Sequence, residues 1–192
     1  MFTGIIENVG IVKRIENEKT NVHFTLSCDF THELKIDQSL AHNGCCLTVV
    51  AINGNEYVVT AIEESLKRTN LGDWRVGDSI NLERCMIMNG RLDGHIVQGH
   101  VDTIGWCSEI IEHDGSTEFV IQYDYDDITV PKGSITINGV SLTVVQSNSN
   151  LFSVHIIPYT IEHTNFKHLK INDKVNLEFD IIGKYVKRMM TK

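Results

Sequence analysis

The chain has 192 residues and a mass of 21.7 kDa, which is above the usual size of one domain and short for two large ones. Hydrophobic residues make up 42% and charged residues 22%, so the chain can bury a core and lacks the composition of a disordered protein. The 17 basic and 25 acidic residues give a net charge of −8, shared equally by the two halves, so neither half has the positive charge that nucleic-acid binding requires.

The cysteines and the N-terminus indicate a reducing compartment. Five cysteines are irregularly spaced, two of them adjacent, and form no CxxC pair, which does not suit a disulfide framework: Cys28, Cys45, Cys46, Cys85 and Cys107. The first sixteen residues show no basic segment before an apolar run, so no signal peptide is predicted. No apolar stretch reaches the roughly 18 residues of a membrane helix. We therefore expect a soluble cytoplasmic protein.

The predicted elements of the first half are short strands rich in apolar, β-branched residues. In chain order, strands are predicted over 9–15, over 22–28, in two runs within 45–62, and over 79–85. The two middle runs flank Asn53 and Gly54, a pair typical of a β-hairpin turn. The best candidate for a helix within this half is 64–74.

The same elements return after a joining segment over 86–98. Strands are predicted over 104–110, 117–123 and 174–180, and a helix is predicted over 160–169. Regularly spaced strands with short turns, in fewer than about 100 residues per half, indicate a small closed barrel or a sandwich.

A shift of 95 residues aligns the two halves without a gap. SLAHNGCCLTVV at 39–50 falls on SITINGVSLTVV at 134–145, and 22 of the 80 aligned pairs between residues 4 and 83 are identical. Chance similarity of Val- and Thr-rich strands would give about one identity in fifteen pairs and would not keep one offset. The chain is therefore predicted to be a duplicated domain.

The C-terminal tail has no counterpart in the first half. Its apolar residues recur with the spacing of one helical face: Ile181, Ile182, Tyr185, Val186, Met189 and Met190. Basic residues lie between them. The pattern favours equally a helix packed on its own domain and a helix that drives self-association.

Several common catalytic motifs are absent. The sequence contains no GxGxxG, GxxxxGK, GxSxG or HExxH, so it gives no support for a dinucleotide site, a P-loop, a hydrolase elbow or a zincin. His95 and His100 lie five residues apart beside acidic residues, but this spacing matches no common helical ligand pair. No metal site is predicted.

The two copies differ in their polar residues at equivalent positions. The differing pairs are Cys46 and Ser141, Ile5 and His100, Thr60 and His155, Asp37 and Lys132, and Cys85 and Asp180. Two similar pockets with different chemical duties would produce such differences. From the residues alone, drift between duplicated copies is favoured over that interpretation.

The sequence also resembles riboflavin synthase of the alpha-subunit type along essentially its whole length. The resemblance is carried by MFTGIIE at the start, AHNGCCLTV at 41–49, TNLGD at 69–73, GHxxxGHVD at 94–102, NGVSLTV at 138–144 and the run at 156–164. Where the family often reads IPETLERT, this chain reads IPYTIEHT, so that Tyr159 and His163 replace Glu and Arg. The departure concerns how the second pocket holds the polar tail of its ligand.

The resemblance implies a fold and an activity. It implies an all-β chain of two tandem six-stranded Greek-key barrels, over 1–97 and 98–180, with an oligomerisation helix over 181–192. The implied enzyme is a transferase that converts two molecules of 6,7-dimethyl-8-ribityllumazine into riboflavin and 5-amino-6-(D-ribitylamino)uracil by moving a four-carbon unit, the last step of riboflavin biosynthesis. It needs no metal and no cofactor.

The resemblance further implies two substrate pockets, each closed by segments of another chain of a homotrimer. The first pocket is implied to contain Ser39, Cys46, Leu47, Thr48, Thr60, Ala61, Ile62, Glu63, Glu64 and Ser65, closed by Gly99, His100, Val101 and Lys132. The second is implied to contain Ser141, Leu142, Thr143, Ile157, Pro158, Tyr159, Thr160, Ile161 and Glu162, closed by Gly4, Ile5 and Ile6.

The reaction needs a base for the acidic C7 methyl of one lumazine and activation of the other as an electrophile. The implied catalytic residues are His100, Ser141 and Asp180, followed by Cys46 and Thr48. We expect Asp180 to orient the Ser141 hydroxyl or a water molecule.

The alternative to an enzyme is a non-catalytic protein that binds lumazine or flavin on the same duplicated fold. A purely structural trimer is a third interpretation. The implied partners are the lumazine substrate and two further copies of the chain, with no nucleic acid and no membrane. Whether the trimer also associates with a lumazine synthase shell stays open.

Overall fold

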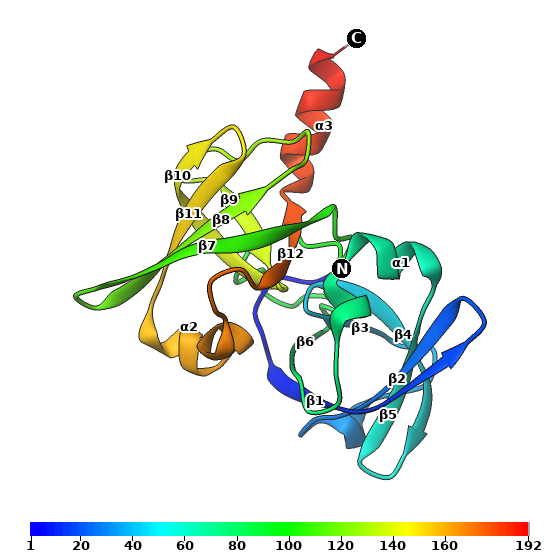
Figure 1. Cartoon of the computed structure of the whole chain (residues 1–192). Helices are drawn as coiled ribbons and strands as arrows, with labels where there is room; N and C mark the ends of the chain where they lie inside the picture. The colour runs from blue at the N-terminus through cyan, green and yellow to red at the C-terminus, as the bar shows by residue number, and fades with distance from the viewer. Residues whose placement is uncertain (192) are drawn as a thin grey trace.

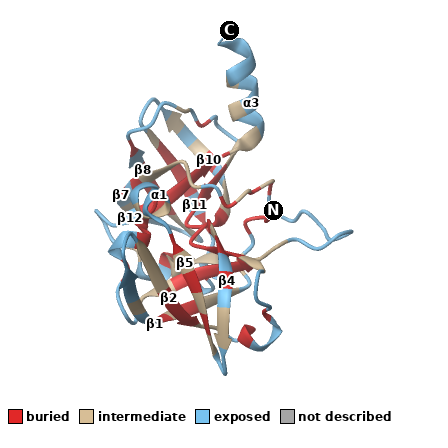
Figure 2. Ribbon diagram, turned by 90° about the vertical axis from the view of Figure 1, so that its right-hand side faces the viewer, coloured by how far each residue is buried: buried red, intermediate tan, exposed pale blue. Residues whose placement is uncertain are grey.

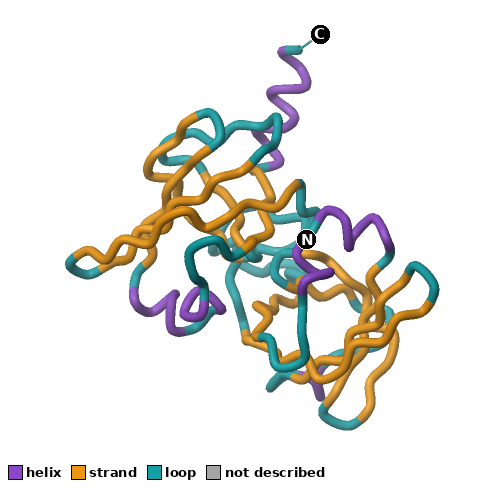
Figure 3. The backbone as a smooth tube through the Cα atoms, viewed as in Figure 1, coloured by secondary structure: helices purple, strands orange, loops and turns teal. Residues whose placement is uncertain are grey.

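Two closed β-barrels and a C-terminal helix make up the computed structural model, which describes residues 1–191 (Figure 1). The tube view shows that strands form the walls of both barrels and that loops fill the region between them (Figure 3). The predicted fold of two tandem six-stranded barrels followed by a helix is confirmed.

The first barrel closes in the strand order β1-β2-β5-β4-β3-β6. Its strands are β1 (Asn8–Glu18), β2 (Asn21–Ser27), β3 (Ser39–His42), β4 (Cys45–Asn53), β5 (Glu56–Ala61) and β6 (Ser79–Arg84). The 3-10 turn η1 (Thr31–Glu33) follows β2, and the helix α1 (Glu63–Arg68) and the 3-10 turn η2 (Asn70–Asp73) follow β5. Because the chain passes from β2 to β3 across the end of the β4–β5 hairpin, the connection is of the Greek-key type.

The second barrel repeats this order in β7-β8-β11-β10-β9-β12. Its strands are β7 (Thr103–His113), β8 (Ser116–Tyr123), β9 (Ser134–Ile137), β10 (Val140–Asn148), β11 (Leu151–Ile156) and β12 (Lys174–Phe179). The helix α2 (Pro158–Glu162) and the 3-10 turn η3 (Asn165–His168) lie where α1 and η2 lie in the first barrel. The predicted helices over 64–74 and 160–169 are thus each divided into a short α-helix and a 3-10 turn.

Each barrel has its own apolar core, formed by the inward side chains of alternating strand positions. Phe24 packs edge-on against Trp74 in the first core, with ring centroids 5.0 Å apart. In the second core, Phe119 packs on Phe166 in the same manner at 5.1 Å. Equivalent core positions therefore explain why the apolar pattern repeats at a constant offset.

The predicted hairpin between β4 and β5 is present, with its turn one residue later than expected. Asn53 pairs with Glu56, so the two central residues are Gly54 and Asn55. Only Gly54 has a positive φ, of 62°. A glycine at the first central position is what a type II′ turn requires.

Asparagines join the two barrels around an approximate two-fold axis. The Asn70 amide donates to Oδ1 of Asn176 and, symmetrically, the Asn165 amide donates to Oδ1 of Asn81, both at 2.7 Å. On the axis, Gly44 faces Gly139 so closely that a Cβ on Gly44 would lie 2.8 Å from the Gly139 nitrogen. These asparagines repeat at the offset of 95 because both sides of the junction use the same surface.

Replacing Asn81 with alanine should lower the free energy of unfolding by about 2 kcal/mol. The side-chain amide of Asn81 donates to Asn138 O and to Asn165 Oδ1, both at 2.9 Å, and the side chain is buried. Its loss leaves buried partners without hydrogen bonds, which costs about 1–3 kcal/mol. Urea denaturation would measure the change, with Asn55→Ala in the exposed hairpin turn as the control. Equal stabilities of the two variants would contradict this role.

The last helix, α3 (Ile181–Met190), projects away from both barrels (Figure 1). Asp180 caps its N-terminus by accepting a hydrogen bond from the Ile182 amide at 2.9 Å, and Lys184 pairs with Asp102 of the second barrel. Most of the helix surface is exposed (Figure 2), including Tyr185 and Met189 on the apolar face. The apolar face is thus largely exposed, which favours self-association over packing on its own domain.

Candidate active site

Two buried carboxylates hold two extended segments at the junction of the barrels. Glu83 in β6 accepts hydrogen bonds from the Thr3 amide at 2.6 Å and the Gly4 amide at 2.9 Å. Its counterpart Glu178 in β12 accepts from the three amides of 98–100 at 2.6 to 2.9 Å. Burial raises the pKa of both carboxyl groups, although the backbone amides oppose this effect.

Each of these two segments contacts a strand of a barrel, β10 or β4, at a glycine. Gly4 accepts a hydrogen bond from the Ser141 amide at 2.8 Å, and Gly99 accepts one from the Cys46 amide at 2.9 Å. Both glycines have positive φ, and an added Cβ would lie 2.5 Å from Ser141 Cβ or 2.7 Å from Cys46 Cβ. Only glycine fits at either place. The contact holds each segment next to Ser141 or Cys46, a pair that differs between the two copies.

The two segments also make contacts within their own chain. Gly4 and Gly99, which are predicted to close pockets of another chain, contact Ser141 and Cys46 of their own chain. Ile6 and Val101, which were expected to act with them, also pack on the cores of the second and first barrel of the same chain. A resemblance identifies residues that act together, but it does not show how the chain crosses between its two barrels.

The predicted first pocket is a strand surface of mixed exposure. Thr48 is exposed and Cys46 is half-buried, so both side chains reach the outer face of β4. Leu47 and Ala61 belong to the barrel core, and only their backbones are available to a ligand. Burial raises the pKa of the Cys46 thiol, and a hydrogen bond with Ser39 opposes this rise, so Cys46 is a neutral thiol near pH 7.

The acidic residues of the first pocket are already paired. Glu63 and Glu64 begin α1 and form ion pairs with Lys67 and Arg68 one turn later, both at 2.6 Å. All four side chains are exposed. Their pairing reduces the negative charge that a ligand would meet at this end of the pocket.

The predicted second pocket has the same frame with different side chains. Ser141 is half-buried and Thr143 is exposed on β10, whereas Leu142 packs partly on the core. The two residues that depart from the family pattern, Tyr159 and His163, stack on one another with ring centroids 4.0 Å apart. An aromatic pair thus takes the place that the family gives to a charged pair.

Sequence analysis named His95 only in a rejected metal-ligand pair and missed its contact with Ser141. Its Nδ1 lies 2.7 Å from Ser141 Oγ and its Nε2 lies 3.2 Å from Thr136 Oγ1. Burial lowers the pKa of His95, although the charge of Asp180 opposes this shift, so the imidazole is neutral near pH 7. His95 lies between the aligned segments 4–83 and 99–178, and comparison of the copies therefore could not find it.

Other predicted residues lie farther from that pair. Asp180 caps α3 through its hydrogen bond to the Ile182 amide and, within residues 1–191, makes no direct hydrogen bond to Ser141, so its orientation of Ser141 or of a water molecule stays a prediction. The His100 side chain is exposed at the edge of the first pocket. Lys132 is exposed just before β9, and its amide donates to the Val144 carbonyl of β10 at 2.8 Å.

Two hollows lie elsewhere on the described part of the chain. One of about 610 Å³ is lined by residues of the barrel junction such as Asn70 and Asn165. Another of about 360 Å³ is lined by residues that include Ser27 and His32. Neither of these two hollows is lined by Cys46 or Ser141.

Comparison with known proteins gives the same division of the chain. The model of the lumazine binding domain matches twice, over residues 3–85 and 98–180. The riboflavin synthase of Actinobacillus pleuropneumoniae is 41% identical over 195 residues, which cover 100% of this chain and 91% of that protein. The chain belongs to the riboflavin synthase family.

Further members of the family agree. The riboflavin synthase of Bacillus subtilis is 37% identical over 100% of this chain and 91% of that protein. The Escherichia coli riboflavin synthase is 36% identical over 94% and 87%. The predicted transferase of the riboflavin synthase type is thus confirmed by relatives aligned along the whole chain.

Solved structures show the same fold. LumP complexed with 6,7-dimethyl-8-(1′-D-ribityl)lumazine superposes with a TM-score of 0.86 at 24% identity, covering 93% of this chain and 99% of that one. LumP complexed with riboflavin gives a TM-score of 0.84 at 25% identity, with 93% and 98% covered. Within residues 1–191, no helix has the length and apolar character to cross a membrane.

Proposed function

We propose that this member of the riboflavin synthase family converts two molecules of 6,7-dimethyl-8-ribityllumazine into riboflavin and 5-amino-6-(D-ribitylamino)uracil. The observation that carries the proposal is a pair of equivalent strand surfaces, at Cys46 and at Ser141, on one duplicated frame. Two copies of one substrate need two similar pockets, and their opposite roles as donor and acceptor of four carbons need different polar groups.

Ser141 is the group best placed for proton transfer or nucleophilic attack in the second pocket. In the neutral tautomer that carries its proton on Nε2, His95 donates to Thr136 and accepts the Ser141 proton at Nδ1. A hydroxyl that donates to a neutral imidazole is activated as in other serine-dependent sites. His95 is thereby a positioning and activating residue for Ser141.

The first pocket has a different task because its groups are different. At neutral pH the Cys46 thiol is a hydrogen-bond donor beside the exposed Thr48 hydroxyl. We assign these two residues, with His100, to holding and polarising the second lumazine. The other predicted lining residues, from Ser39 to Ser65 and from Ser141 to Glu162, contribute backbone groups and walls, and Lys132 closes the first pocket from another chain.

We further propose that three chains associate through α3 and that each complete site joins the first pocket of one chain to the second pocket of its neighbour. The exposed Thr48 and Thr143 side chains beside Cys46 and Ser141 support this arrangement, because a second barrel would exclude water from the reacting rings. The domain limits that follow are 1–97, 98–180 and 181–192, the last of which includes one residue outside the described part. The five free cysteines support a cytoplasmic location.

Deleting residues 181–192 should convert the trimer into smaller species. The exposed apolar side chains of α3 include Ile182 at 61% and Met190 at 80%, and burying such a face is what stabilises an association. Light scattering would measure the mass. A truncated chain with the mass of the intact protein would contradict the role of α3.

The reaction itself is tested by mixing the purified protein with 6,7-dimethyl-8-ribityllumazine. The proposal predicts flavin absorbance that grows with time, with two lumazines consumed for each riboflavin formed. A non-catalytic binding protein would instead change the lumazine spectrum once, on mixing. A structural protein would leave the spectrum unchanged.

A further inference from the structure

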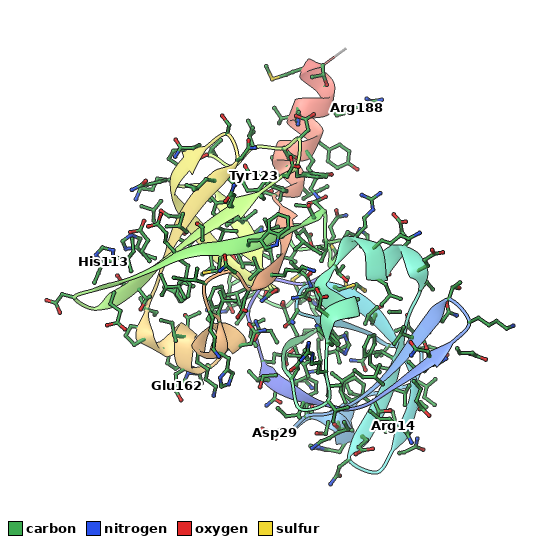
Figure 4. All side chains as sticks on the ribbon, viewed as in Figure 1. Arg14, Asp29, His113, Tyr123, Glu162 and Arg188 are labelled. Atoms are coloured by element: carbon green, nitrogen blue, oxygen red, sulfur yellow. The ribbon has the colours of Figure 1, made fainter. Side chains whose placement is uncertain are left out.

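Three ionisable side chains meet on the outer face of the second barrel. Glu118 in β8 stands directly opposite His155 in β11. On the other side, Glu118 pairs with Ile111 of β7, two residues before His113, which places His113 diagonally from Glu118 on the same face. His113 lies near the outer end of the β7–β8 hairpin, away from α3 and the first barrel (Figure 4).

The two imidazoles converge on one carboxylate oxygen. Nε2 of His113 lies 3.1 Å from Oε2 of Glu118, and Nε2 of His155 lies 3.5 Å from the same atom. The rings are nearly parallel, 16° apart, with centroids separated by 4.9 Å. The ligand atoms all lie within 4.8 Å of one another. Ligands at metal–ligand distances of about 2.0–2.1 Å around a tetrahedral ion are separated by roughly 3.3 Å, so the two measured separations already suit a shared ion.

Among the described residues, the carboxylate of Glu118 has no lysine or arginine partner. Glu118 is only 8% exposed because the imidazoles cover it, yet it faces outward, since the next residue, Phe119, belongs to the barrel core. Within residues 1–191, its ion pairs are with His113 and His155 alone. A covered carboxylate without a lysine or arginine partner can serve as an anionic ligand for a cation.

We infer that His113, Glu118 and His155 bind a divalent transition-metal ion of the Zn²⁺ class on the outside of the second barrel. Two imidazole nitrogens and one carboxylate oxygen form a common three-ligand set for zinc, with water in the remaining position. The ion would replace the proton on each Nε2, and that proton would move to Nδ1. At His155 this new Nδ1–H faces Ser116 Oγ at 3.4 Å, which would fix the ring in the ligating tautomer.

None of the three ligands belongs to the two proposed substrate pockets, so the inference does not depend on the proposed reaction. The histidines are partly exposed, with side-chain exposures of 41% for His113 and 35% for His155, and an ion can reach them from solvent. Sequence spacing could not indicate this site, because its ligands come from three strands. Sheet register alone brings them together.

The first barrel provides an internal control. The residues at the equivalent positions are Glu18, His23 and Thr60, so the first carboxylate and histidine exchange places and the second histidine is a threonine. His23 uses both ring nitrogens, with Nε2 3.0 Å from Glu18 and Nδ1 2.9 Å from Thr60. This set offers one nitrogen ligand fewer and should bind an ion far more weakly.

The test uses full-length protein freed of metal by dialysis against a chelator. Titration with Zn²⁺ should show one tight site per chain by calorimetry, and Co²⁺ should give visible absorption bands of a low-symmetry site with nitrogen and oxygen ligands. His155→Thr copies the first barrel and should weaken both ions at least about 100-fold. His113→Gln, at another exposed position, should do the same, whereas His23→Gln should leave binding unchanged.

Two results would overturn the inference. One is that the wild-type protein binds neither ion at millimolar concentration, or that His155→Thr and His113→Gln bind the ions as tightly as the wild-type protein does. The other is an intense near-ultraviolet band on adding Co²⁺ that persists in His155→Thr, because that band would identify cysteine thiolates as the ligands.

Discussion

Replacing Ser141 with alanine should lower turnover by roughly 10²-fold or more, the scale expected when a positioned acid–base group or nucleophile is lost. The wall at Ser141 keeps its backbone, including the amide that donates to Gly4 at 2.8 Å. Riboflavin affinity should therefore be nearly unchanged. Steady-state kinetics and fluorescence titration would separate the two quantities, with Ser149→Ala in an exposed turn as the control.

The same experiment tests whether Ser141 works through His95. Groups that act as a unit give non-additive effects, so His95→Ala and the double variant should each resemble Ser141→Ala in turnover. Turnover close to the wild-type value in Ser141→Ala would reject the serine as the reacting group. A double variant whose loss is the product of the two single losses would show that the 2.7 Å contact with His95 has no catalytic use.

Acidification from pH 7 to 5 should remove about 2 kcal/mol of stability through one buried histidine in the first barrel. His42 lies between the carbonyl oxygen of Leu40 and the hydroxyl of Tyr57, both at 3.0 Å. The carbonyl can only accept, so Nδ1 carries the proton and Nε2 accepts from Tyr57. Burial lowers the pKa of His42 to about 3, against an unfolded value near 6.5.

Acidification lowers the stability because the unfolded chain binds a proton that the folded chain does not. Below about pH 6.5 the unfolded chain binds a proton at His42 that the folded chain excludes. The free energy of unfolding therefore decreases as the pH is lowered from about 6.5 to about 3. His95 contributes in the same direction. The second barrel supplies the matched variant, because Ile137 and Phe152 stand at the positions of His42 and Tyr57.

Urea denaturation at pH 7 and pH 5 measures this effect. The variant His42→Ile with Tyr57→Phe should lose about 2 kcal/mol less than the wild-type protein over this range. Identical losses in the two proteins would contradict a neutral, buried His42. Since both side chains copy the other barrel, the core should keep its packing.

Most of the architecture could be predicted from the sequence because the strands, turns and core positions of one half repeat in the other. Strand periodicity predicted the long strands, and the constant offset of 95 predicted that both halves share one barrel. The short strands β3 and β9 have four residues each, too few for alternation to identify them alone. The paired asparagines were visible as repeats, but only the structure shows that they join the barrels.

The site was less predictable, for physical reasons that differ from residue to residue. In the sequence, Glu83 and Glu178 look like ordinary acidic residues at the end of a strand. Their partners are backbone amides of distant segments, which no sequence motif identifies. His95 lies outside the aligned copies. The placement of Gly4 and Gly99 depends on how the chain crosses between barrels, which no local pattern encodes.

The central claim is that two pockets with different duties meet between neighbouring chains. It can be tested by mixing two inactive proteins, one with Ser141→Ala in the second pocket and one with Thr48→Tyr obstructing the first. Thr48 is exposed on β4, so an aromatic residue is compatible with the strand. After unfolding and joint refolding, mixed trimers would be verified by native mass spectrometry.

If sites form between chains, random assortment gives an intact first pocket beside an intact second pocket in about one quarter of the sites, and turnover should return to roughly a quarter of the wild-type value. If each site forms within one chain, every site in the mixture carries one of the two changes. Turnover that stays at the mean of the two parent variants, in a sample shown to contain mixed trimers, would contradict the account.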